Sequence, residues 1–109
     1  MNPSSTPSNL HQMQQSASQA ESLLKELANA NRLMVLCALL SGEKTVGNLA
    51  EIVGLSQSAL SQHLARLRTA GLVSAEKRGL HVYYRICSAE AQALLPVLYL
   101  IYCKRRVIY

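Results

Sequence analysis

Cysteine is the residue type in this sequence with the widest range of chemistry, because a thiolate can attack an electrophile, bind a soft metal or form a disulfide. The 109-residue chain has three cysteines, Cys37, Cys87 and Cys103, at wide spacings. An odd number of cysteines so far apart is a poor disulfide framework for a secreted domain. The cysteine pattern therefore predicts a cytoplasmic protein, in which any pairing of thiols is regulatory.

Other residues that could do chemistry are sparse in this chain. The sequence has three separated histidines, His11, His63 and His81, and no aspartate. It also has no CxxC pair, no HExxH motif and no glycine-rich phosphate loop. Because a zinc site needs three or four convergent ligands, the sequence predicts neither an enzyme nor a bound metal or cofactor.

The positive charge of the chain is concentrated in its second half. Residues 1–60 carry three basic and four acidic side chains, whereas residues 61–109 carry eight basic and two acidic ones. A basic region on a small domain suggests a polyanionic partner, with nucleic acid as the first choice. There is no apolar run of about 18 residues and no secretory leader pattern, which argues against a membrane span or export.

The first part of the chain is expected to hold a polar tail and two helices. Residues 1–16 are predicted to be a disordered tail, and residues 17–109 one small domain. Leucines at helical spacing predict a first helix over residues 17–30. A second helix follows, capped by Asn29 or Asn31. It is apolar on nearly every side, so we expect it to be the fully buried central helix of the core.

The stretch TVGNLAEIVGLSQSALSQHLARLRTAGLV has the pattern of a helix-turn-helix. Thr45 can cap a short helix over residues 46–53, which Gly54 ends, and Ser56 can cap a second helix that lasts to about Ala70. Two helices joined by a short turn with a glycine are typical of DNA-binding proteins.

The second of these helices has one apolar face and one short, polar face. The apolar face repeats every three or four residues and should point into the core: Leu60, Leu64 and Leu67. The opposite face is short and uncharged: Ser58, Ser61, Gln62, Ala65 and Thr69. Such a face suits a helix that enters a DNA major groove, because Gln and Ser can hydrogen-bond to base edges.

The rest of the chain predicts a hairpin and a last helix. Residues 72–86 alternate apolar and polar with Gly79 in the loop, so they form a two-stranded hairpin, placed like the wing of a winged helix. Ser88 can cap a helix that continues to about Cys103, in which Pro96 is expected to cause a kink or a break. Apolar residues on more than one side of it favour burial in a homodimer. The predicted fold is mainly α with a small β-hairpin, a winged helix-turn-helix of order α-α-α-α-β-β-α.

These segments resemble the ArsR family of winged helix-turn-helix repressors. The resemblance is carried by LANANRLMVLCALL, by the helix-turn-helix stretch and by GLHVYYRI, within about Ser18 to Cys103. It implies a homodimer joined through its first and last helices, which binds a palindromic operator. It also implies an inducer that weakens DNA binding.

The polar helix face and the wing supply the expected DNA contacts. The residues expected to reach base edges lie near the start of the helix: Gln57, Ser58, Ser61 and Gln62. The residues expected near phosphates are Arg66, Arg78 and His81. His63 lies near the apolar edge of its helix, so we expect it to be half-buried or to contact a phosphate.

The metal sites of the family are not matched by this sequence. One family site uses cysteines in a stretch resembling ELCVCDL, where this chain has EKTVGNL. Thr45 and Gly47 stand at the two cysteine positions, which leaves no thiolate for a soft metal. Another family site uses Asp and His of the last helix, where this chain offers only Glu90.

Cys37 and Cys103 resemble the thiol pair of the persulfide- and redox-sensing subgroup, the BigR, SqrR and HlyU-like regulators. In that subgroup a cysteine of the second helix and one of the last helix are joined within a protomer by a disulfide or polysulfide bridge. The resemblance implies that reactive sulfur species bridge Cys37 and Cys103 and thereby lower operator affinity. The basic residues 104–106 favour a Cys103 thiolate, so Cys103 is expected to attack first and Cys37 to resolve the persulfide. Cys87 is interpreted as structural.

Several alternatives remain open from the sequence. The inducer could be peroxide, another oxidant or a metal instead of sulfane sulfur. The protein could be a HlyU-like antirepressor that displaces another silencer instead of a direct repressor. A winged-helix module that binds proteins is a further alternative, against which the polar helix face and the basic wing argue.

Overall fold

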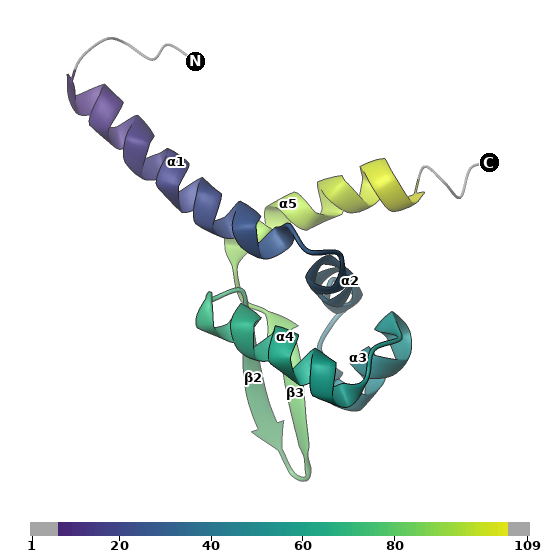
Figure 1. Ribbon diagram of the computed structural model, residues 1–109. Coiled ribbons are helices and arrows are strands. Elements are labelled where there is room, and N and C mark those ends of the chain that lie inside the picture. The colour runs from purple at the N-terminus through teal and green to yellow at the C-terminus, as the bar shows by residue number, and fades with distance from the viewer. Residues whose placement is uncertain (1–6, 105–109) are drawn as a thin grey trace.

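The computed structural model describes residues 7–104. Its elements are α1 Pro7–Leu27, α2 Ala30–Leu39, β1 Lys44–Thr45, α3 Val46–Val53, α4 Gln57–Thr69, β2 Val73–Arg78, β3 His81–Ile86, α5 Ala89–Tyr99 and the π-helical turn η1 Leu100–Lys104. Helices α1 and α5 extend from a body formed by α2, α3, α4 and the hairpin, whose tip points away from them (Figure 1). This arrangement confirms the predicted winged helix-turn-helix.

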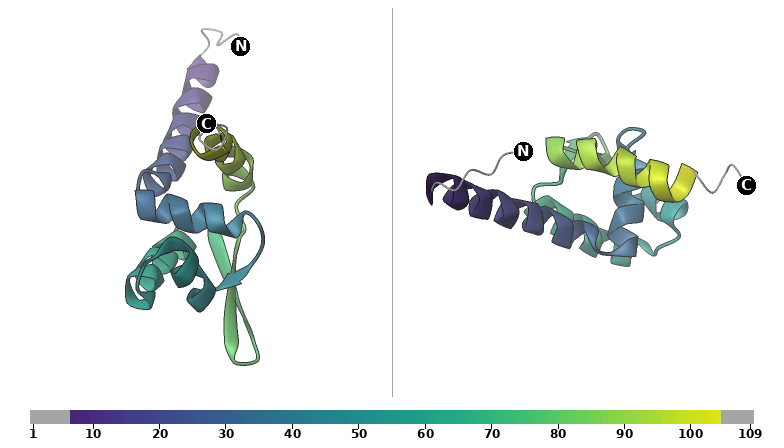
Figure 2. Two further views of the ribbon diagram at one scale, coloured as in Figure 1. Left: turned by 90° about the vertical axis from the view of Figure 1, so that its right-hand side faces the viewer. Right: turned by 90° about the horizontal axis from the view of Figure 1, so that it is seen from above.

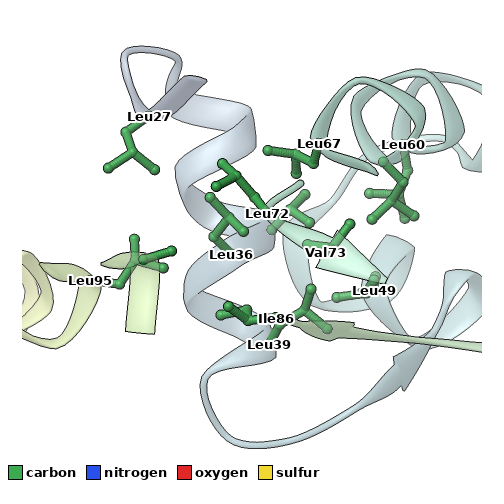
Figure 3. Packing of buried hydrophobic residues seen from close by; sticks show 13 residues of the cluster. Leu27, Leu36, Leu39, Leu49, Leu60, Leu67, Leu72, Val73, Ile86 and Leu95 are labelled. Carbon is green, nitrogen blue, oxygen red and sulfur yellow. The ribbon is translucent and has the colours of Figure 1, made fainter. Parts of the chain in front are cut away.

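The core forms around α2, as its apolar sequence predicts. This helix contacts α1, α3, α4, α5 and β3, and its side chains Val35, Leu36 and Leu39 are buried. Within residues 7–104, each α-helix and both hairpin strands contribute to one cluster of buried hydrophobic residues (Figure 3). The expectation that α2 is buried on every side is wrong at Met34, which is 43% exposed.

Polar side chains start the helices where the sequence predicts. The backbone N–H of Arg32 donates to Oδ1 of Asn29, so Asn29 and not Asn31 caps α2. Helix α1 therefore ends at Leu27, before the predicted residue 30. The other caps follow the same geometry, each side chain accepting a backbone N–H three residues further on: Thr45 for α3, Ser56 for α4 and Ser88 for α5.

Helix α1 begins earlier than the sequence predicts. It starts at Pro7, so that residues 7–16, expected to belong to a disordered tail, are helical, while residues 1–6 of that tail lie outside the described part of the chain. Proline suits the first position of a helix because its missing N–H would have no partner there. Leu10 and Met13 also continue the apolar helical spacing of the later turns toward the N-terminus.

The sheet has one strand more than the predicted hairpin. Strands β2 and β3 pair antiparallel from Val73↔Ile86 to Arg78↔His81, which confirms the hairpin. Strand β1 pairs antiparallel with the other edge of β3 through Lys44↔Tyr84 and Thr45↔Tyr83, which gives the strand order β1-β3-β2. A two-residue strand is too short to show alternation in the sequence.

The last helix changes its type instead of breaking at its proline. Helix α5 continues past Pro96 to Tyr99 and then widens into η1. Ala91 and Leu95, both before Pro96, are fully buried in the core, which holds the first turns of α5 in place despite the missing proline N–H. The break expected as one alternative at Pro96 is therefore wrong, and the helix instead changes to a π-helical turn from Leu100 onward. No helix in the described part of the chain is long and apolar enough to cross a membrane.

Candidate DNA interface and thiol site

Helices α3 and α4 form the helix-turn-helix around a tight glycine turn. Gly54 has a φ of 74°, a left-handed conformation that glycine adopts without a Cβ clash, and Ser56 starts α4 directly afterwards. The inner face of α4 is fully buried: Leu60, Leu64 and Leu67. The outer face is exposed at each position predicted for it: Gln57, Ser58, Ser61, Gln62, Ala65 and Thr69. The structure confirms both faces of α4.

Two other side chains of α4 lie at the edge of that outer face. His63 is half-buried, as expected from its place near the apolar stripe. Arg66 is tied to helix α1, because its Nε donates to Oε1 of Glu26 at 2.9 Å and its Nη2 donates to Oε2 at 3.4 Å. This bond raises the pKa of Arg66 above its ordinary value. Nothing in the sequence near Arg66 indicated Glu26, which lies 40 residues away.

Arg78 holds the wing against the body of the domain. Its guanidinium forms an ion pair with Glu43 in the loop before β1, lies 3.9 Å from Oε1 of Glu76 through its Nε, and stacks over the Tyr83 ring. The hydrogen bond to Glu43 raises the pKa of Arg78 above its ordinary value. His81 is exposed and meets the Tyr83 ring edge-on. The phosphate contacts expected of these wing residues remain predictions.

Cys37 and Cys103, 66 positions apart in the sequence, are close enough for their charges to interact. Cys37 is half-buried on α2, whereas Cys103 is exposed on η1, and both thiols are free. Burial raises the pKa of Cys37, and the charge of Cys103 raises it further. Cys37 also lines one pocket with Tyr99 of α5 and Leu100 of η1, the segment that carries Cys103.

A pocket of about 680 Å³ opens beside Cys37. Its walls come from α2, β1, α3, α5 and η1, and include Lys44, Ile52, Tyr99 and Leu100. The thiol of Cys37 can therefore be reached by a small molecule from solvent.

The third cysteine lies apart from this pair. Cys87 follows β3, and its thiol donates to the backbone oxygen of Gly71 across 3.5 Å. It lines a different pocket, between α1, the end of α4 and the start of α5. Thr45, at a cysteine position of the family's metal site, caps α3 instead. Within residues 7–104 there is no cluster of three His, Cys, Asp or Glu side chains that could hold a metal.

Helices α1 and α5 with η1 expose apolar side chains. On α1 these are Leu10, Met13 and Leu24; on α5 and η1 they are Val97, Tyr99, Leu100, Ile101 and Tyr102. Figure 2 shows both segments projecting beyond the body of the domain, away from the hairpin tip. Exposed apolar faces of this kind are typical of protein–protein interfaces.

Comparison with known proteins identifies relatives over almost the whole chain. Residues 29–75 match the family described as bacterial regulatory protein, arsR family. The chain is 46% identical to the transcriptional activator HlyU of Vibrio cholerae over 98 residues, which covers 90% of this chain and 91% of the relative. It is 38% identical to the biofilm growth-associated repressor of Xylella fastidiosa, covering 84% of this chain and 80% of that one.

Solved structures similar to this chain include members of the same family. Reduced HlyU from Vibrio cholerae superposes with a TM-score of 0.81 at 46% identity, covering 84% of this chain and 97% of that chain. A homodimeric winged helix-turn-helix domain from Mycobacterium bovis, a possible ArsR-family regulator, has a TM-score of 0.72 at 28% identity, covering 89% of this chain and 90% of that chain. The chain therefore belongs to the ArsR family of bacterial transcriptional regulators, in the subgroup that contains HlyU and BigR.

Proposed function

We propose that this protein is a cytoplasmic, homodimeric repressor whose affinity for a palindromic operator falls when reactive sulfur species join Cys37 to Cys103 within a protomer. The observation that carries this proposal is the placement of the two thiols. One lies on the central core helix and the other at the end of the last helix, within electrostatic range of each other. A bond between them would tie η1 to the core.

The exposed face of α4 supports DNA binding. It presents two glutamines and two serines over its first turns: Gln57, Ser58, Ser61 and Gln62. These side chains can donate to and accept from base edges in a major groove. The wing adds Lys77, Arg78 and His81, whose side chains are exposed at or near its tip and suit phosphate contacts.

The apolar faces of α1 and α5 support a homodimer. A 109-residue domain that leaves Leu24, Val97 and Tyr102 exposed gains from burying them against a second copy. The homodimeric relative from Mycobacterium bovis has the same fold. A two-fold dimer presents two α4 helices, which must lie about 34–36 Å apart to reach successive major grooves.

The sulfur chemistry balances with an organic persulfide, R–S–S–H, as the oxidant. The Cys103 thiolate attacks the terminal sulfur, the S–S bond of the donor breaks, and the R–S⁻ that leaves takes a proton to become R–SH. Cys37 then gives up its proton and attacks Sγ of the Cys103 persulfide. A disulfide forms and H₂S leaves, so the two thiols lose two electrons and the donor gains them.

The bridge would act on DNA binding through the dimer contact. Cys103 lies on η1, whose exposed apolar residues belong to the proposed dimer contact. Fixing η1 to α2 therefore changes the surface that meets the second copy of the chain. A small change in the tilt of one protomer against its partner at this contact moves the two α4 helices relative to each other. Nearly complete release of DNA requires about 5 kcal/mol of difference between the two states.

Mass spectrometry of the intact protein tests the chemistry directly. Reduced protein is exposed in parallel to glutathione persulfide, to peroxide and to a disulfide. The intact mass of each product is measured, and the product is then digested so that linked cysteine peptides can be identified. We expect the persulfide to link the Cys37 and Cys103 peptides within one chain, and the Cys87→Ser variant to give the same link. The proposal fails if the persulfide leaves both peptides unlinked, or if the link joins two different chains.

A second function is favoured by one comparison. HlyU of Vibrio cholerae, which shares 46% identity with this chain, is described as a transcriptional activator. The same DNA-binding and sensing parts could raise transcription if the protein displaces another silencer from the promoter. A reporter fused to the promoter of the protein's own operon distinguishes a repressor from an antirepressor. Deleting the gene for this protein raises reporter expression if it is a repressor and lowers it if it is an antirepressor.

A further inference from the structure

The pocket beside Cys37 is much larger than the reactions of two thiols require. Its volume is about 680 Å³, which is within the usual range of about 300–1,000 Å³ for small-molecule sites. Hydrosulfide or peroxide would fill a small part of it. The volume instead suits an organic molecule of several carbon atoms.

The walls of this pocket are mostly apolar. Ile52 of α3, Pro96 and Tyr99 of α5 and Leu100 of η1 line it together with Cys37. Ile52 is 56% exposed although it is large and apolar, and it lies outside the faces of α1 and α5 assigned to the homodimer. These surfaces favour contact with a carbon chain, because covering them removes apolar area from water.

Lys44 is the charged side chain among the described residues of the pocket wall. Its Nζ donates to Oγ of Ser41 at 2.9 Å and to the backbone oxygen of Gly42 at 3.4 Å, which holds the ammonium group near the pocket. The neighbouring Glu43 is paired with Arg78 of the wing, and no described carboxylate forms an ion pair with Lys44. The ammonium is therefore free to bind an anionic group.

We propose that this pocket binds the organic part of the sulfur donor, and that the donor is a small persulfide carrying a carboxylate. The carboxylate pairs with Lys44, the carbon chain lies along Ile52 and Pro96, and the terminal sulfur reaches the thiol pair. The transfer is the one written above, in which R–SH and then H₂S leave. This inference rests on the proposed function, since it names the donor for the same two thiols.

The test compares two donors that differ only in the carboxylate. These are the persulfide of N-acetylcysteine and the persulfide of N-acetylcysteine methyl ester. Formation of the Cys37–Cys103 link is followed by quenched intact-mass analysis over a range of donor concentrations. We expect the half-saturating concentration of the acid to be about fivefold lower than that of the ester, as one partly exposed ion pair would give.

Two variants show whether Lys44 is the cause. In Lys44→Gln the preference for the acid should disappear, while Lys44→Arg should retain it because the positive charge remains. Equal half-saturation of both donors in the wild type, or an unchanged preference in Lys44→Gln, overturns the inference and leaves the proposed function intact. Failure of both donors to link the thiols in the wild type overturns the proposed function, and the donor assignment with it.

Discussion

Cys37 and Cys103 carry the same functional group in different surroundings. Cys37 is half-buried on α2, and burial together with the charge of Cys103 raises the pKa of its thiol. Cys103 is exposed on η1. Because the thiolate is the nucleophile, these surroundings favour Cys103 for the first attack and leave the resolving step to Cys37.

The raised pKa of Cys37 predicts how the resolving step depends on pH. The thiolate fraction of Cys37 increases about tenfold per pH unit until the pH reaches its pKa, which lies above the ordinary value of 9.0. Closure of the bridge from the Cys103 persulfide should therefore keep accelerating between about pH 7 and 9. Quenched intact-mass analysis at several pH values measures this rate. A plateau below about pH 8 would contradict the surroundings described for Cys37.

Base and phosphate contacts should respond differently to mutation. Gln62→Ala should relax sequence preference by about 1–3 kcal/mol at one base pair and leave non-specific binding unchanged. Arg78→Ala should weaken binding to every sequence and reduce the slope of affinity against salt by about one. Titration of specific and unrelated DNA over a salt series checks both. Loss of specific and non-specific binding alike in both variants would refute this division of roles.

Glu43→Gln is the control for the wing. Since Glu43 pairs with Arg78, this change frees the guanidinium without removing it. Affinity should then stay the same or rise if Arg78 contacts phosphate. A loss equal to that of Arg78→Ala would instead mean that the pair acts by holding the wing.

At the scale of elements, Arg32 connects α1 to the core. It is 7% exposed, its Nε donates to the backbone oxygen of Glu26 at 2.7 Å, and its Nη2 donates to that of Lys25 at 3.0 Å. These are carbonyls at the end of α1, which have no partner within the helix. Glu26 also reaches Arg66 of α4. The end of α1 is thereby fixed to both α2 and α4.

Removing Arg32 should therefore destabilise the domain. Arg32→Ala leaves the last carbonyls of α1 without donors, and we expect the free energy of unfolding to fall by about 2–3 kcal/mol. Lys25→Ala removes an exposed pair with Glu21 and should cost less than about 1 kcal/mol. Urea unfolding at one fixed protein concentration measures both. Equal effects of the two variants would contradict the anchoring role.

The elements that the sequence predicts well are those with local signals. Thr45, Ser56 and Ser88 start their helices as expected, because capping involves residues only three positions apart. The early start of α1 has only a weak local signal, because Pro7, Leu10 and Met13 stand in an otherwise polar stretch. The strand β1 has no local signal, because it forms only where β3 lies beside it.

The same limit applies to the candidate site. The exposed face of α4 follows from helical periodicity, so its residues could be named from the sequence. The partners of Arg66 and Arg78, and the position of Lys44 on the pocket wall, depend on contacts between distant segments. No periodicity or spacing indicates Glu26 or Glu43 as partners, 40 and 35 residues from the arginines that they bind.

At the scale of the whole molecule, the apolar faces of α1 and α5 determine the assembly. Leu24 on α1 is 53% exposed. Leu24→Glu should shift the protein from dimer to monomer and weaken operator binding, since a charge in an apolar interface is costly to desolvate. Sedimentation velocity measures the change. Leu80→Glu is the matched control, because Leu80 is 96% exposed at the wing tip and should leave the dimer intact. A dimer unaffected by Leu24→Glu would place the interface elsewhere.

The measurement closest to the central claim is DNA affinity before and after the two thiols are joined. Reduced and persulfide-treated protein are titrated against the promoter DNA of the protein's own operon at one salt concentration, because phosphate contacts make affinity strongly dependent on salt. We predict a loss on the order of a thousandfold or more on treatment, as nearly complete release requires, restored by a reductant and absent in Cys103→Ser. Equal affinities of the reduced protein and of protein shown by mass to carry the Cys37–Cys103 link would contradict the account.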